Sequence, residues 1–165
     1  MAENEKLIEQ RCCELLKARG MTFAAAESCT GGLIAKRLTD LPGISAVYKG
    51  GVVSYTNSVK HGVLGVPQEL LDQYGAVSAP VAKAMAEGAR RVLGCDIAVS
   101  TTGVAGPDSD DRGNPVGLVF VAIAAGDGVH VRELHAGQSR ERVRTMAAHN
   151  AFDLVRRYLT GLPMD

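Results

Sequence analysis

The stretch MTFAAAESCTGGLIAKRL, residues 21–38, decides the fold class of this 165-residue chain. It begins with an apolar run of strand length at 21–26 and then passes through small hydroxyl residues and two glycines into a helical segment at 33–38. A strand that leads through such a turn directly into a helix is typical of α/β proteins. Ligands of α/β proteins bind where strands end and helices begin, so the polar turn at 27–32 is the first candidate site.

The sequence on either side of this stretch continues the alternation of helices and strands. The same patterns predict helices at 8–19, 57–63, 67–73, 79–93 and from Ser139 onward, and strands at 46–55, 96–101, 118–124 and 129–134. The glycine-rich connection at 125–128 indicates a hairpin. We therefore expect a three-layer α/β/α sandwich whose mixed sheet ends in a C-terminal antiparallel hairpin. Without a linker or repeat, residues 1–165 are expected to form one domain.

Composition disfavours several classes of function. Lys plus Arg number 18 and Asp plus Glu number 18, whereas proteins that bind duplex nucleic acid usually carry a basic excess. The polar, acidic start at residues 1–6 does not resemble a signal peptide, and no run of about 18 apolar residues could span a membrane. The four cysteines lack CxxC or Cys/His ligand spacing, so neither a disulfide framework nor a zinc site is expected. We expect a cytoplasmic protein with no nucleic-acid partner, membrane partner or metal.

The turn at 27–32 is the first candidate for a catalytic or binding site. Backbone N–H groups at the start of the following helix can hold an anion or an oxyanion. The alternative is that Ser28 or Thr30 only caps the helix. Cys29 is a further potential nucleophile, although no motif pairs it with a histidine.

A second candidate joins Ser45, Tyr55 and Lys60. A serine becomes a nucleophile only if a neighbouring group accepts its proton. A lysine with a pKa lowered by burial can do this, and a tyrosine can relay the proton. The alternative is that Ser45 is a turn residue and Lys60 a solvated charge.

Two further segments carry polar side chains at element ends. The glycine-rich loop at 100–107 follows a strand, so Thr102 could orient a substrate there, unless the loop is a plain turn. Segment 137–144 crowds three arginines at a predicted helix N-terminus, where the helix dipole disfavours cations unless an anion binds. A phosphate group would satisfy this site, and the alternative is a solvated face paired with Glu141.

Five short sequence motifs follow one another along the chain in a characteristic order. They are AAESCTGG at 25–32, YTNSVK at 55–60, GAVS at 75–78, GVAGP at 103–107 and PVGLV at 115–119, followed by the arginine-rich start of the last helix. From about Ile8 to Leu159 the chain resembles the C-terminal domain of the competence/damage-inducible CinA proteins in its stand-alone form. That family is the nicotinamide-nucleotide amidase family.

This resemblance implies hydrolysis of the carboxamide of nicotinamide mononucleotide (NMN), giving nicotinic acid mononucleotide and ammonia in the recycling of pyridine nucleotides for NAD metabolism. It implies a metal-independent Ser–Tyr–Lys arrangement at Ser45, Tyr55 and Lys60, without a cofactor. The choice between Ser45 and Ser28 as nucleophile stays open. The implied substrate-binding residues are Ser28, Thr30, Gly31, Thr102, Gly103 and Arg142.

Larger CinA proteins carry an additional N-terminal domain with pyrophosphatase activity, and this chain is expected to lack it. We also expect a homo-oligomer, a dimer or higher. The alternative function is a non-catalytic nucleotide-binding or regulatory module, which would use the same glycine loops and arginines while Ser45 and Lys60 stay structural. Release of ammonia from NMN distinguishes the two functions.

Overall fold

The computed structural model describes residues 6–137 and 139–165, so the N-terminal segment compared above with a signal peptide lies largely outside the described residues. The described chain contains one five-stranded sheet in the order β2-β1-β3-β4-β5. Its strands are β1 (Phe23–Glu27), β2 (Tyr48–Val53), β3 (Ile97–Gly103), β4 (Leu118–Ala125) and β5 (Gly128–His135). Strand β1 pairs in parallel with β2 and β3, while β4 and β5 are antiparallel. The sheet is therefore mixed and ends in the expected hairpin.

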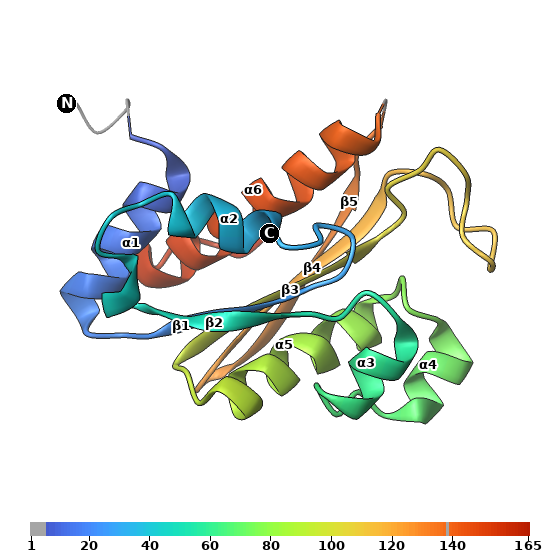
Figure 1. Cartoon of the computed structure of the whole chain (residues 1–165), viewed down its shortest axis with the longest axis horizontal. Helices are drawn as coiled ribbons and strands as arrows, with labels where there is room; N and C mark the ends of the chain where they lie inside the picture. Colours follow the sequence, from blue (N-terminus) through green and yellow to red (C-terminus); the bar gives the residue numbers. More distant parts are fainter. Residues whose placement is uncertain (1–5, 138) are drawn as a thin grey trace.

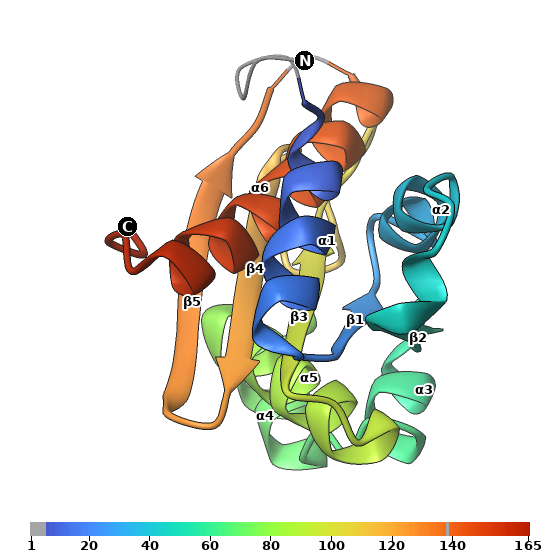
Figure 2. The same ribbon diagram turned by 90° about the vertical axis from the view of Figure 1, so that its left-hand side faces the viewer.

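Helices cover both faces of this sheet (Figure 1). One face carries α1 (Ile8–Arg19), α2 (Leu33–Thr39) and α6 (Arg140–Thr160), and Figure 2 shows α1 and α6 side by side. The other face carries α3 (Asn57–Gly62), α4 (Gln68–Tyr74) and α5 (Ala79–Leu93). The arrangement confirms the predicted α/β/α sandwich. None of the helices in the described ranges is long and apolar enough to cross a membrane.

Alternation along the strands divides the core between the two faces. In β1, Phe23 and Ala25 belong to the core under α1 and α6, whereas Ala24 and Ala26 belong to the core under α5. The small side chains on the second face let α5 pack closely. Within α5, a Cβ at Gly88 would collide with the carbonyl oxygen of Leu64, so only glycine fits there.

The one clear difference from the sequence prediction lies at the start of β2. The strand was expected from residue 46, but Ile44–Ala46 form a short 3₁₀ helix, η2, and the strand begins at Tyr48. Gly43 starts this turn with a φ of 78°, in the left-handed region that glycine adopts readily. The amide of Val47 then donates to the carbonyl of Ile44 at 3.0 Å, which keeps the segment out of the sheet. Ser45 therefore lies at the amino end of β2.

Candidate functional site

The carboxyl ends of the three parallel strands meet at one edge of the sheet. Glu27, the last residue of β1, is in register with Val53 on β2 and with Thr101 on β3. Backbone pairing continues beyond the strands, because the Ser28 amide donates to the Thr101 carbonyl at 3.0 Å and the Ser54 amide donates to the Glu27 carbonyl at 2.8 Å. Ser28 is thus held between the ends of its two neighbouring strands, where α/β proteins place their ligands.

Lys60 reaches this point from α3, the helix that follows β2. Its Nζ donates to Ser28 Oγ at 3.0 Å and to the Ser54 carbonyl at 2.8 Å. Its side chain is 1% exposed, and burial lowers the pKa of Lys60 to about 8. An amine with this pKa is partly neutral near physiological pH, and a neutral amine can accept the proton of a serine hydroxyl.

A buried carboxylate holds the turn that carries Ser28. The two oxygens of Glu27 accept hydrogen bonds from the amides of Ile34 and Ala35, at 2.8 and 3.1 Å, in the first turn of α2. These bonds tie the end of β1 to the start of α2 and so close the segment 28–32 into a fixed loop. Gly31 and Gly32, with φ of 55° and 103°, supply the left-handed conformations that this loop requires.

Arg144 supports the same turn from α6. Its Nε donates to the Cys29 carbonyl at 3.1 Å and its Nη2 donates to the Thr30 carbonyl at 2.9 Å. The Thr30 hydroxyl faces the sheet, 2.8 Å from the hydroxyl of Thr101. Burial raises the pKa of Cys29 to about 11, so this cysteine is a neutral thiol at physiological pH and lacks the activation that a nucleophile needs.

A pocket of about 180 Å³ opens directly above Ser28 and Lys60. Its lining comes from the segments that follow the three parallel strands, the loop before α5 and the start of α6: Ser28, Cys29, Tyr55, Asn57, Lys60, Ala76, Val77, Thr102, Gly103, Ala105 and Arg140. The Thr102 hydroxyl donates to the Ala76 carbonyl at 2.7 Å, which fixes one wall. No cluster of three or more metal-ligating side chains occurs in residues 6–137 and 139–165.

Arg140 bridges the rim of this pocket. Its Nη2 donates to the phenolic oxygen of Tyr55 at 3.1 Å, and its Nη1 donates to the Gly106 carbonyl at 2.6 Å. Tyr55 itself is 58% exposed. The bridge joins the chain after β2 to the loop after β3 and leaves one guanidinium at the pocket entrance.

Of the nine residues to which the resemblance gave a catalytic or binding role, five line the pocket, namely Ser28, Tyr55, Lys60, Thr102 and Gly103. Thr30 and Gly31 lie in the supporting turn instead. Ser45 is exposed in η2, and the six residues of β2 separate it from Lys60. At about 3.3 Å per residue, the six residues of that strand span about 20 Å, and Ser45 precedes the strand whereas Lys60 follows it. The structure thus corrects the expected meeting of Ser45 and Lys60, and Ser28 takes that place.

Arg142 is likewise outside the pocket. It is exposed, and its backbone amide donates to the Ser139 side chain, which caps α6. Residues two positions apart on a helix point in nearly opposite directions, so the inward position belongs to Arg140. The cluster of arginines correctly indicated this end of α6. The sequence does not show how α6 is rotated about its own axis, and this rotation decides which arginine faces the pocket. Asn57, Ala76 and Val77 lie in the sequence motifs at 55–60 and 75–78, but the sequence analysis assigned no role to them.

Comparison with known proteins identifies the family of this chain. The model of the CinA C-terminal domain family matches residues 5–159. A putative competence-damage inducible protein from Acetivibrio thermocellus is 50% identical over 160 residues, covering 97% of this chain and 38% of the relative. A protein with the same description from Caldanaerobacter subterraneus is 47% identical over 164 residues, covering 99% of this chain and 40% of the relative. The chain therefore spans about two fifths of the length of these curated relatives.

Solved structures of similar size share the fold. A CinA superfamily protein from Klebsiella pneumoniae superposes with a TM-score of 0.90 at 31% identity, covering 93% of this chain and 96% of the other. A competence/damage inducible protein from Agrobacterium tumefaciens gives a TM-score of 0.86 at 39% identity, covering 93% and 95%. Matching sequence, fold and chain coverage lead to one conclusion: the chain belongs to the CinA C-terminal domain family.

Proposed function

We propose that this chain is an amidase that hydrolyses the carboxamide of NMN, with Ser28 as the nucleophile and Lys60 as its base. The observation that carries this proposal is the 3.0 Å contact between Lys60 Nζ and Ser28 Oγ, made by a buried lysine with a pKa of about 8. A nucleophile beside its own base is the minimum that covalent amide hydrolysis requires. The choice of NMN as substrate rests on the resemblance to the amidases of the CinA family.

The chemistry follows from these two side chains. Neutral Lys60 takes the hydroxyl proton while Ser28 Oγ bonds to the carboxamide carbon. When the C–N bond breaks, Lys60 returns that proton to the leaving nitrogen, and ammonia departs. Lys60 then takes a proton from water, which attacks the ester and releases nicotinic acid mononucleotide as Ser28 recovers its hydrogen.

The surrounding groups fit the charges that these steps create. Backbone N–H groups in the turn after Ser28 are the proposed donors to the oxyanion, and Glu27 and Arg144 hold that turn in place. A rigid turn matters because such donors stabilise a transition state only if they need no rearrangement. Tyr55 lines the same pocket and is proposed to support Lys60 in proton transfer.

The dimensions of the pocket favour partial enclosure of a nucleotide. A volume of about 180 Å³ lies below the roughly 300–1,000 Å³ typical of pockets that enclose a whole small ligand. We propose that the pyridine ring enters and that the ribose and phosphate extend past the rim. Arg140 stands at that rim and is the proposed partner of the 5′-phosphate.

Ammonia release tests this proposal. Purified wild-type protein is incubated with NMN after exhaustive chelation, beside Ser28→Ala and Ser45→Ala proteins. Ammonia should appear with wild type and with Ser45→Ala and be absent with Ser28→Ala. Binding of NMN without ammonia from any of the three proteins would favour the non-catalytic nucleotide-binding module. Loss of ammonia release on chelation, with recovery when one divalent metal is added back, would overturn the metal-independent mechanism.

A further inference from the structure

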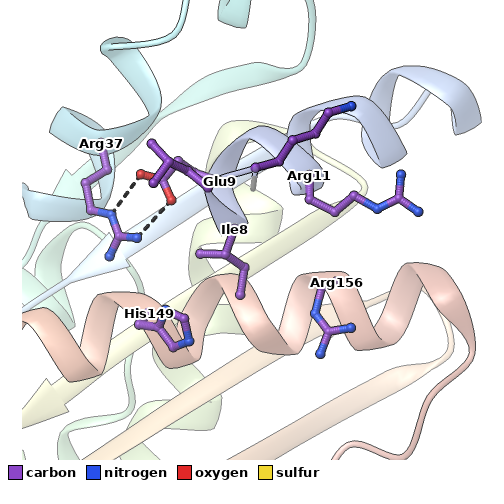
Figure 3. Close-up of a pocket in the computed structure, with 8 residues that line it drawn as sticks. Ile8, Glu9, Arg11, Arg37, His149 and Arg156 are labelled. Atoms are coloured by element: carbon purple, nitrogen blue, oxygen red, sulfur yellow. Dashed lines mark hydrogen bonds and ion pairs between the residues drawn. The ribbon is translucent and has the colours of Figure 1, made fainter. Parts of the chain in front are cut away.

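A second cavity, about 550 Å³ in volume, lies between α1, α2 and α6 and shares no residue with the pocket at Ser28. Its lining is mostly cationic: Lys6, Leu7, Ile8, Glu9, Arg11, Arg37, His149 and Arg156. Figure 3 shows Arg37 turned toward Glu9, while His149 and Arg156 come from α6 across from α1. Four formal positive charges and the Glu9 carboxylate line this space, and the neighbouring Glu14 carboxylate lies 2.8 Å from Lys6 and 3.7 Å from Arg11.

Glu9 does little to offset the other cations. Arg37 binds both of its oxygens, with Nη2–Oε2 at 2.8 Å and Nε–Oε1 at 3.2 Å. Burial alone would raise the pKa of Glu9, but the hydrogen bonds and positive charge around it, chiefly those of Arg37, together lower the pKa. The Arg37 guanidinium also stacks 5.0 Å from the centre of the Phe152 ring. This pair is a fixed, internally neutral wall of the cavity.

The positive excess is concentrated around Asp153. This single carboxylate contacts Arg132 at 2.9 Å and Arg156 and Arg157 at 2.8 Å. Burial tends to raise the pKa of Asp153, but the three arginines lower it to about 2. The carboxylate is therefore ionised, and its single negative charge is shared among three guanidinium groups. Arg156 faces the cavity with its charge only partly compensated, and a further anion would reduce the repulsion among these arginines.

We propose that this cavity binds a small organic anion carrying a phosphate or diphosphate group. Guanidinium groups present paired N–H donors that match phosphate oxygens, and Lys6, whose Nζ donates to Glu14 at 2.8 Å, adds a further positive charge at the edge of the cavity. Leu7 and Ile8 supply an apolar side for the organic part. The volume lies within the range of sites that enclose a small ligand.

Isothermal titration calorimetry on the full chain tests the site with inorganic pyrophosphate and, separately, with a nucleoside diphosphate, UDP. Both should bind saturably to wild type, and tighter binding of UDP would identify an organic diphosphate as the preferred source. The double variant Lys6→Gln/Arg156→Gln should weaken binding by about tenfold or more, because two charge-assisted contacts are lost. It should leave ammonia release from NMN unchanged.

The matched control removes two positive charges elsewhere. Lys49 and Lys83 are exposed and outside this cavity, so Lys49→Gln/Lys83→Gln should keep the wild-type affinity. A third protein, Arg140→Gln, should also keep it, because Arg140 belongs to the other pocket. Circular dichroism and thermal melts establish that each variant is folded. The proposal is overturned by absence of saturable binding, by equal weakening in both double variants, or by loss of binding confined to Arg140→Gln.

Discussion

Each end of the parallel part of the sheet presents a serine and a lysine, and only one pair is arranged for chemistry. At the carboxyl end, Ser28 and Lys60 are buried and hydrogen-bonded to each other. At the amino end, Ser45 and Lys49 are both exposed. The residue types are the same, so the difference arises from where the backbone converges and excludes water. The contrast predicts that reactivity in this molecule depends on burial and contact more than on residue type.

The two ends differ because of how the strands are connected. At the carboxyl end, β1 and β2 each lead into a helix that folds back over the sheet, which brings Ser28 and Lys60 together. At the amino end, η2 turns the chain outward before β2 begins. Substitutions at both ends test whether this contrast is also a functional one.

The largest effect is expected from the two serines. Ser28→Ala removes the proposed attacking oxygen and should lower kcat for NMN by at least about 10⁴-fold. Ser45→Ala should stay within about twofold of wild type, because an exposed turn residue seldom matters. Initial rates of ammonia release, with circular dichroism to verify folding, provide the measurement. A folded Ser28→Ala protein that keeps most of its kcat, beside an inactive Ser45→Ala protein, would reverse the assignment.

Lys60 should rank next. Lys60→Ala removes the proposed base and is expected to lower kcat by about 10²–10⁴-fold. The double variant should be little worse than Ser28→Ala alone, since residues that act as one unit are not additive. Fully additive losses, measured in the same ammonia assay, would argue that the two side chains act independently.

The pH profile of the wild-type protein sharpens that assignment. Only neutral Lys60 accepts a proton, and its pKa is about 8, so kcat/KM should rise with pH and level off above that value. A rate that is flat from pH 6 to 9 would contradict lysine as the base.

The two arginines at the start of α6 should show a smaller contrast. Arg140→Gln should raise KM for NMN by roughly tenfold, because a charge-assisted phosphate contact contributes about 1.5–3 kcal/mol. Arg142→Gln should change KM less than about twofold, since Arg142 is exposed and outside the pocket lining. The nucleoside without its phosphate serves as a second substrate and should be poor for wild type. Equal hydrolysis of nucleoside and nucleotide would rule out a phosphate site at the rim.

Sequence patterns predicted the fold well because periodicity records which face of an element is buried. The apolar run before Glu27 and the hairpin at 125–128 are local signals, and both elements form as expected. The pairing of Ser28 with Lys60 is not local, because it depends on β1 and β2 lying side by side in parallel. Likewise, η2 decides that Ser45 faces solvent, and the rotation of α6 decides that Arg140 rather than Arg142 reaches the pocket. These three features follow from tertiary packing, and the spacing of residues along the chain does not predict them.

The smallest expected effect compares the two lysines through stability. Lys60 has a pKa of about 8 in the folded protein against an ordinary value of 10.5, which applies to the unfolded chain. Below pH 8 the lysine is protonated in both states, and the cost of burying its charge is present in full. Between about pH 8 and 10.5 the unfolded chain binds more protons than the folded one, so the free energy of unfolding should rise with pH. At about 1.4 kcal/mol per pKa unit, the gain is at most about 3.5 kcal/mol.

Lys60→Met removes this titration, whereas Lys49→Met removes an exposed lysine and should leave the dependence intact. Urea unfolding of the three proteins from pH 7.5 to 10.5 measures the free energies. The stability of wild type relative to Lys60→Met should increase steadily across that range, because every other titrating group is common to both proteins and cancels in the difference. The stability of wild type relative to Lys49→Met should stay nearly constant. A constant difference for Lys60→Met would mean that Lys60 keeps an ordinary pKa in the folded protein, and the carboxyl end would then lose the base that distinguishes it from the amino end.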